Sequence, residues 1–211
     1  MDTIVVSGKA SGVGKTTLIG RIIKNLGCRT GVIKTSLQTN LKEVIVTDSE
    51  EVILNKSSDT AIFKEAGADR VVFLKSDYHH LKESLERARE LIKGVDYLLI
   101  EGNSILDYLN PDLIIYLTSK GLEAKPSAVK AETRADIIID NSNHILEDNE
   151  VAQGDLPDKL FLQEGLSFNA DHISCHKAHL IARVLGYKPA VIGRRLDEAG
   201  IRIRNCQLGL F

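Results

Sequence analysis

A stretch of glycines, a lysine and two threonines near the amino terminus has the composition of a phosphate-binding loop. It reads Ser7-Gly8-Lys9-Ala10-Ser11-Gly12-Val13-Gly14-Lys15-Thr16-Thr17. Gly12 and Gly14 allow the backbone to curl so that successive N–H groups point at phosphate oxygens. Lys15 would reach the β- and γ-phosphates of a nucleotide, and the Thr16 hydroxyl would bind Mg²⁺. The chemistry expected here is therefore binding of a nucleoside triphosphate together with its metal ion.

The sequence on either side of the loop supplies the strand and the helix that such a loop needs. An apolar run at residues 3–6 precedes it, and residues 18–26 follow with apolar side chains on one helical face. The amino terminus of that helix adds a partial positive charge at the phosphates. The usual pattern has a glycine where this chain has Lys9. We therefore expect Gly8 to end the strand and Lys9 to add a cation near the phosphates.

A carboxylate follows the apolar run at residues 97–100 and gives a second candidate for the site. Such a run is typical of a parallel strand buried on both faces, and Glu101 would lie at its carboxyl end. A carboxylate there can hold Mg²⁺ or orient an attacking water, although it can also simply cap a helix. We therefore expect Lys15 and Glu101 to be catalytic, and Thr16 and Glu101 to hold the Mg²⁺.

Three other segments carry polar residues whose roles the sequence leaves open. Ser58-Asp59-Thr60 is either a helix cap or a loop that touches the γ-phosphate. Lys34-Thr35 is either a nucleotide-sensing strand end or a solvated one. Lys120 and the turn Lys125-Pro126-Ser127 either border the base or lie in solvent. The residues expected to bind the nucleotide are Gly12, Val13, Gly14, Lys15, Thr16, Thr17 and Asp59.

The composition limits the class of protein. The 211 residues are 43% hydrophobic and 27% charged, an ordinary soluble mixture that argues against disorder, and the net charge of −2 gives no general attraction to nucleic acid or to an acidic membrane. No apolar run approaches the roughly 20 residues that span a bilayer. The three cysteines are too few and too widely spaced for a disulfide framework, and no secretory signal is visible. We therefore expect a cytoplasmic protein with no membrane partner.

Apolar strands that alternate with helical patterns predict an α/β fold with a mostly parallel sheet and helices on both faces. Residues 1–148 are expected to form a P-loop nucleotide-binding domain, and residues 149–166 are expected to form an acidic connector. Residues 167–211 are expected to form a small helical unit that resembles a helix-turn-helix. In that unit, Gly186 ends one helix, Pro189 starts the next and Gly200 ends it.

The carboxyl-terminal unit carries two further hypotheses. Its arginines make it locally basic, as DNA binding requires, but docking on the first domain or dimer formation is the favoured role. Cys175 and His179 share a helical face, and Cys206 could fold back toward them. Such a Cys/His set suits zinc, whereas buried cysteines and a polar helix face explain the same residues without a metal.

Four segments together resemble the molybdopterin-guanine dinucleotide biosynthesis protein B family. They are Gly12-Val13-Gly14-Lys15-Thr16-Thr17, Gly31-Val32-Ile33-Lys34, Asp59-Thr60 before Glu65-Ala66-Gly67-Ala68, and Leu99-Ile100-Glu101-Gly102. The resemblance covers roughly the first half of the chain. It implies a homodimeric GTP-binding protein with weak GTPase activity that assists attachment of a guanine nucleotide to the molybdenum cofactor. It also implies contact with molybdopterin or a molybdenum-cofactor enzyme, and places Asp59 and Glu101 on the Mg²⁺ or substrate side.

The chain departs from that family pattern at two places. Thr35 stands where the family has a histidine, and Asn103 stands where an aromatic residue is common. The sequence does not decide between GTP and ATP. The alternatives are a regulatory protein in which the nucleotide or cofactor controls the carboxyl-terminal unit, and a small-molecule kinase or metal-insertion GTPase on the same fold.

Overall fold

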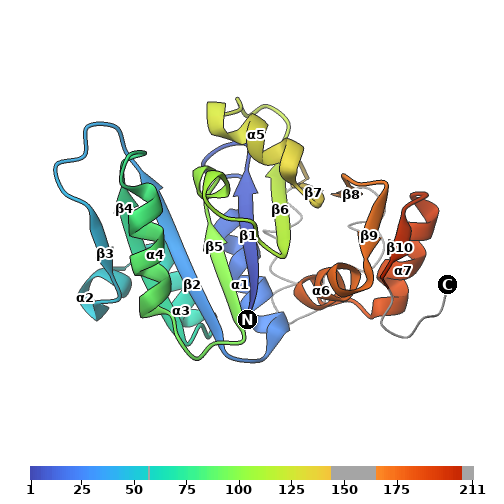
Figure 1. The fold of residues 1–211 in the computed structure, drawn as a ribbon, viewed down its shortest axis with the longest axis horizontal. Coiled ribbons are helices and arrows are strands. Elements are labelled where there is room, and N and C mark those ends of the chain that lie inside the picture. Colours follow the sequence, from blue (N-terminus) through green and yellow to red (C-terminus); the bar gives the residue numbers. More distant parts are fainter. Residues whose placement is uncertain (57, 144–164, 206–211) are drawn as a thin grey trace.

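The centre of the protein is an eight-stranded sheet, seen in a computed structural model that describes residues 1–56, 58–143 and 165–205. The strand order is β3-β4-β2-β5-β1-β6-β7-β8. Six strands run parallel, and only the outermost two, β3 and β8, pair antiparallel with their neighbours (Figure 1). The strands are β1 (Asp2–Gly8), β2 (Thr30–Leu37), β3 (Ile45–Thr47), β4 (Arg70–Ser76), β5 (Tyr97–Glu101), β6 (Leu113–Thr118), β7 (Ile137–Asp140) and β8 (Leu166–Phe168). The expected α/β fold with a mostly parallel sheet is therefore confirmed.

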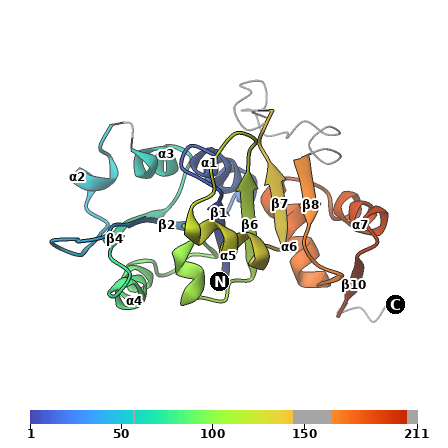
Figure 2. The ribbon, with the colours of Figure 1, turned by 90° about the horizontal axis from the view of Figure 1, so that it is seen from above.

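Helices cover both faces of the sheet because the central strands are apolar on both sides. In β1, Ile4 and Val6 pack with α1 on one face, and Val5 belongs to the core on the other face. Figure 2 shows α1, α2 and α3 on one side and α4 and α5 on the other. The helices of this part are α1 (Lys15–Leu26), α2 (Glu50–Ile53), α3 (Asp59–Glu65), α4 (Leu81–Leu91), the 3₁₀ turn η1 (Ser104–Asp107) and α5 (Pro126–Arg134).

The last part of the chain packs beside the sheet against α1. Its elements are β9 (His172–Ser174), α6 (Cys175–Leu185), α7 (Pro189–Glu198) and β10 (Arg202–Arg204). The two expected helices are present, and the strands that flank them pair in parallel with each other. Asn25 Nδ2 donates to the Val184 carbonyl at 3.1 Å, and the Arg183 guanidinium donates to the Tyr97 hydroxyl at 2.9 Å. A helix-turn-helix role for this unit stays a prediction.

Two local expectations differ from the structure, and one short helix was not predicted. That helix is α2, which begins at Glu50, where acidic residues favour a helix start. Pro126 was expected in a turn, but it is the first residue of α5, a position that suits its fixed backbone angle. Residues 166–168 continue the main sheet as β8 by pairing with β7, a contact between distant segments that no local pattern reveals.

Candidate functional site

The glycine-rich loop has the backbone that phosphate binding requires. Gly12 and Gly14 adopt left-handed angles, with φ of 76° and 100°, and Gly14 precedes the first residue of α1. Gly8 is the last residue of β1, as expected, and an added Cβ there would lie 2.8 Å from Val13 Cγ1. The loop therefore needs glycine at Gly8 because of close packing, and at Gly12 and Gly14 because of the backbone conformation.

Two asparagines hold the loop in place. The Gly8 N–H donates to Asn103 Oδ1, and Asn103 Nδ2 donates to the Gly8 carbonyl, both at 3.0 Å. Asn141 Nδ2 donates to the Val13 carbonyl at 3.2 Å. Neither asparagine was singled out in the sequence as a site residue. Each follows a strand end, at Glu101 and Asp140, so its place at the carboxyl edge of the sheet was the available signal.

Three oxygen-bearing side chains converge next to the loop. Thr16 Oγ1 donates to Asp59 Oδ1 at 2.9 Å and lies 3.4 Å from Glu101 Oε2. Lys34 Nζ lies 2.6 Å from both Asp59 Oδ2 and Glu101 Oε1. The residues come from four separate elements, α1, β2, α3 and β5. The structure thus brings together Thr16, Asp59 and Glu101, and it adds Lys34 as the cation that joins the two carboxylates.

The electrostatics of this group are tightly linked. Burial opposes the charged form of Lys34, but Glu101 and Asp59 outweigh it and raise the pKa of that ammonium. Burial is the largest single influence on Asp59 and opposes its ionisation, but the hydrogen bond and charge of Lys34, together with the hydrogen bond from Thr16, outweigh it and lower the pKa of the carboxyl. Burial lowers the pKa of Lys15; the Glu101 carboxylate opposes this shift, and the charges of Lys34 and Lys125 add to it. The Lys15 ammonium donates to the Ala10 carbonyl at 2.9 Å, so the ammonium group is partly buried within the loop.

A cavity of about 290 Å³ lies over this group, and we call it the first cavity. It is lined by Ser11, Gly12, Gly14, Lys15, Thr16, Thr17, Lys34, Asp59 and Glu101. Val13 is part of the loop but is buried below it. The Thr16 hydroxyl and the Asp59 and Glu101 carboxylates are hard oxygen ligands of the kind that Mg²⁺ prefers. In this structure the positive charge between the two carboxylates comes from the Lys34 ammonium. The residues therefore fit a divalent cation.

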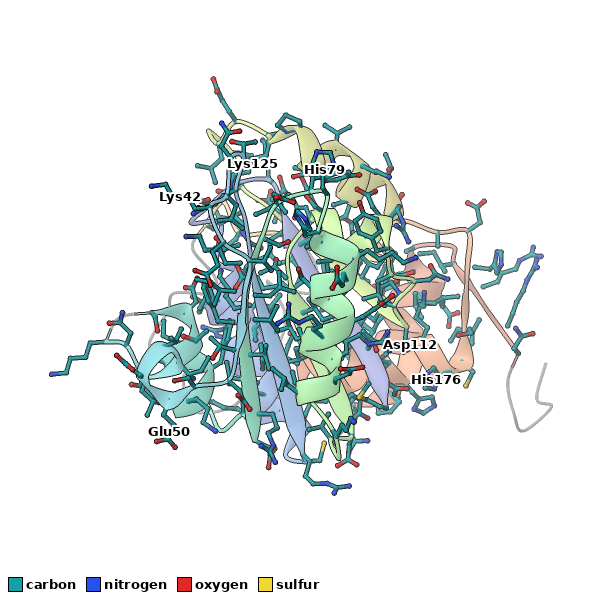
Figure 3. The ribbon with its side chains drawn as sticks, turned by 60° about the vertical axis from the view of Figure 1, so that its left-hand side comes forward. Lys42, Glu50, His79, Asp112, Lys125 and His176 are labelled. Carbon is teal, nitrogen blue, oxygen red and sulfur yellow. The ribbon has the colours of Figure 1, made fainter. Side chains whose placement is uncertain are left out.

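A larger cavity of about 690 Å³, the second cavity, adjoins the first one. The two share Ser11, Lys15, Lys34 and Glu101. The second cavity extends over the carboxyl ends of β1, β2 and β5 toward the first residues of α4 and α5, which is where parallel sheets commonly bind ligands. Lys125, one of its lining residues, is labelled at that end of the sheet in Figure 3.

Lys9 and Lys120 lie outside both cavities. The Lys9 ammonium donates to the Ser119 carbonyl at 3.4 Å, so its charge is directed at the loop after β6 and not at the first cavity. The Lys120 N–H donates to Ser142 Oγ at 2.8 Å, which ties together the loops after β6 and β7.

The expected cysteine and histidine site falls partly outside the described residues. Cys206 lies beyond them, so a site formed by Cys175, His179 and Cys206 stays a prediction. In the part of the chain that the structure describes, the group with metal-ligand spacing is instead Asp2, Asp112 and His176, whose ligand atoms lie within 4.8 Å of one another. Figure 3 labels Asp112 and His176 near each other, far from Lys125. Asp112 and His176 are exposed and Asp2 is half-buried, and Asp112 Oδ2 already accepts the Thr3 N–H at 2.7 Å.

Comparison with known proteins identifies no family. No family model matches the chain, and no curated protein matches it. Among solved structures, the chain is similar to the MinC:MinD cell division protein complex of Aquifex aeolicus, with 14% sequence identity and a TM-score of 0.34. The alignment covers 96% of this chain and 79% of that chain. Across residues 1–56, 58–143 and 165–205, no helix has the length and apolar character needed to cross a membrane.

Proposed function

We propose that this protein binds a nucleoside triphosphate with Mg²⁺ in the first cavity and hydrolyses it slowly. The observation that carries the proposal is the convergence of Thr16, Asp59 and Glu101 beside Lys15, over a loop whose glycines have left-handed angles. Phosphate oxygens would accept from the backbone N–H groups of the loop at the start of α1.

Each side chain has a separate role in this proposal. The Lys15 ammonium stabilises negative charge on the β- and γ-phosphates, which favours transfer of the γ-phosphoryl group. Thr16, Asp59 and Glu101 would hold the Mg²⁺, and the ion would supply positive charge that neutralises the phosphate oxygens. Glu101, buried at the end of β5, also orients the attacking water.

The test is calorimetric titration of the purified protein with ATP and with GTP, each with Mg²⁺. We expect micromolar binding of at least one of them and a loss of at least 100-fold in Lys15→Met, since the ammonium contacts two phosphates. The control is Lys93→Ala, which removes an exposed lysine beyond α4 that lines neither cavity. Equal affinity in wild type and Lys15→Met would contradict the proposal.

The finer part of the proposal concerns the nucleotide and the pathway. The sequence resemblance of the first half of the chain supports GTP as the nucleotide, a homodimer, and assistance to molybdenum cofactor maturation. A preference of tenfold or more for GTP, with a dimer in analytical ultracentrifugation, is the expected result. A preference for ATP would exclude the guanine nucleotide role and leave the proposed phosphate site intact.

A further inference from the structure

The first and second cavities meet at a shared wall, and this arrangement suggests a second substrate. Ser11, Lys15, Lys34 and Glu101 line both cavities. A triphosphate seated on the loop would therefore end beside the second cavity, with its γ-phosphate next to the same lysines. A molecule held in the second cavity would lie within reach of that phosphate, as phosphoryl transfer requires.

The charge of the second cavity favours an anionic ligand. Lys15, Lys34 and Lys125 contribute three ammonium groups to its lining. Glu101 is the carboxylate among the described lining residues, and its Oε1 lies 2.6 Å from Lys34 Nζ. The lysines outnumber this one carboxylate, so an anion bound among them would be stabilised by their positive charge.

The remainder of the lining favours an aliphatic ligand over an aromatic one. It includes the buried apolar residues Leu81 and Ile105 and the hydroxyl-bearing residues Thr35 and Ser127. The described residues that line the cavity include no Phe, Tyr or His, so a flat heteroaromatic ring finds no stacking partner there. A short carbon chain with an anionic end suits a lining that combines apolar residues with hydroxyls and ammonium groups.

The same lining contains no group suited to act as a general base for an alcohol. Glu101 is held by Lys34 and by Thr16, and the other described titratable groups of the cavity are lysines. An alcohol must lose a proton as it attacks phosphorus, whereas a carboxylate is already ionised at neutral pH. The cavity therefore suits an acceptor that attacks without proton transfer.

We propose that the second cavity binds a short aliphatic carboxylate, which accepts the γ-phosphoryl group and becomes an acyl phosphate. This step rests on the proposed binding of a nucleoside triphosphate in the first cavity. A lone pair of the carboxylate oxygen forms the new bond to the γ-phosphorus. The bond from that phosphorus to the β–γ bridging oxygen breaks, and its electron pair leaves with the nucleoside diphosphate. No proton moves, and no redox partner is needed.

The lysines have distinct parts in this transfer. Lys15 stabilises the charge that develops on the leaving diphosphate, and Lys34 reduces the repulsion between the two anions as they approach. Lys125 lies at the outer side of the cavity, where its Nζ donates to Ser11 Oγ at 2.8 Å, and it would orient the carboxylate. Ser127, in the first turn of α5, lines the second cavity but not the first.

The experiment traps the acyl phosphate with hydroxylamine, which converts it to a hydroxamate that is measured by its iron complex. The full chain is incubated with Mg²⁺, with ATP or GTP, and in turn with acetate, butyrate, hexanoate, succinate and adipate. We expect at least one of these carboxylates to raise hydroxamate formation tenfold or more above the reaction without carboxylate. Nucleotide binding is measured in parallel by calorimetry.

Two substitutions at one position test the location of the acceptor. Ser127→Asp places a negative charge in the second cavity, and Ser127→Asn adds similar volume without charge. We expect the Asp variant to form hydroxamate at least tenfold more slowly than the Asn variant with the best carboxylate. Equal rates in the two variants would overturn this cavity as the acceptor site.

The outcomes separate this inference from the proposed function. If the wild type binds nucleotide but none of the five carboxylates yields hydroxamate, the carboxylate acceptor is wrong and the first cavity stands. If a carboxylate accelerates nucleoside diphosphate release without hydroxamate, the acyl phosphate is also wrong. If neither ATP nor GTP binds, the proposed function itself fails.

Discussion

Replacing Lys34 by Met removes the cation that joins Asp59 and Glu101 and keeps most of the side-chain volume. The Glu101 side chain is 5% exposed and the Lys34 side chain is 17% exposed, with 2.6 Å between their charged atoms. Removal of one partner of such a buried pair costs about 3–5 kcal/mol, because a charge is left uncompensated. Asp59, whose side chain is 39% exposed, adds roughly 1 kcal/mol or less. We expect the free energy of unfolding to fall by about 3 kcal/mol, the lower end of that range, because Lys34 is partly open to water.

The assay is equilibrium unfolding in urea at pH 7. With an m-value of roughly 2 kcal/mol/M, the expected loss lowers the unfolding midpoint by about 1.5 M. The matched substitution is Glu101→Gln, which removes the negative charge and leaves Lys34 its contact with Asp59. The double variant should be more stable than the sum of the single effects predicts, by about 2 kcal/mol, because the stranded carboxylate is gone.

Two results would refute this reasoning. A loss below about 1 kcal/mol in Lys34→Met would mean that water or another group compensates the Glu101 charge. Additivity of the two single variants within about 0.5 kcal/mol would mean that the two charges do not interact in the folded state. Lys93→Ala, an exposed lysine outside both cavities, is the control and should change stability by less than about 0.5 kcal/mol.

Three further predictions test other parts of the site and fold. Because Lys34 holds the pKa of Asp59 below its usual 3.8, the carboxylate stabilises the fold above that pH, and this stability is lost as the pH falls through the lower folded value. Asp59→Asn should therefore cost about 1 kcal/mol at pH 6 and less at pH 3, as measured by urea unfolding; an equal cost at both would contradict it. Gly8→Ala should cost about 1–3 kcal/mol, since its Cβ would lie 2.8 Å from Val13 Cγ1 and 3.1 Å from the Leu117 carbonyl oxygen; an unchanged melting temperature would exclude this clash. Ile181→Ala, at a fully buried position of α6, should cost about 2–5 kcal/mol in the same urea assay, whereas a surface-like cost below 0.5 kcal/mol would mean that α6 is not packed as described.

The sequence predicted those parts of the fold whose signal is local. The run at residues 97–100 is apolar throughout because β5 is buried on both faces, and it was identified as a strand for that reason. The loop glycines were also recognisable, since left-handed backbone angles favour glycine at Gly12 and Gly14. Hydrophobic periodicity and backbone constraints depend on short segments of sequence, so these elements could be predicted without knowing the rest of the chain.

The remainder depends on contacts between distant segments. Lys34 was left open between a ligand-sensing role and a solvated one, and its contact with Glu101 spans 67 positions of sequence. Asn103 clamps Gly8 across 95 positions, a contact that only the pairing of β1 with β5 creates. Lys9 was expected near the phosphates because of its position in the loop, but its side chain turns toward Ser119. The direction of a side chain in a loop is set by the residues that surround it in space, and the sequence does not reveal which residues those are.

The two antiparallel strands at the borders of the sheet also affect how the molecule behaves in a crowded solution. A parallel sheet that ended at β4 would expose the N–H and C=O groups along one edge of a seven-residue strand to pairing with another chain, and one that ended at β7 would expose those of a four-residue strand. Here β3 covers β4 and β8 covers β7, and each is only three residues long. Short borders give an incoming strand few hydrogen bonds. The short border strands therefore complete the fold and also limit edge-to-edge aggregation.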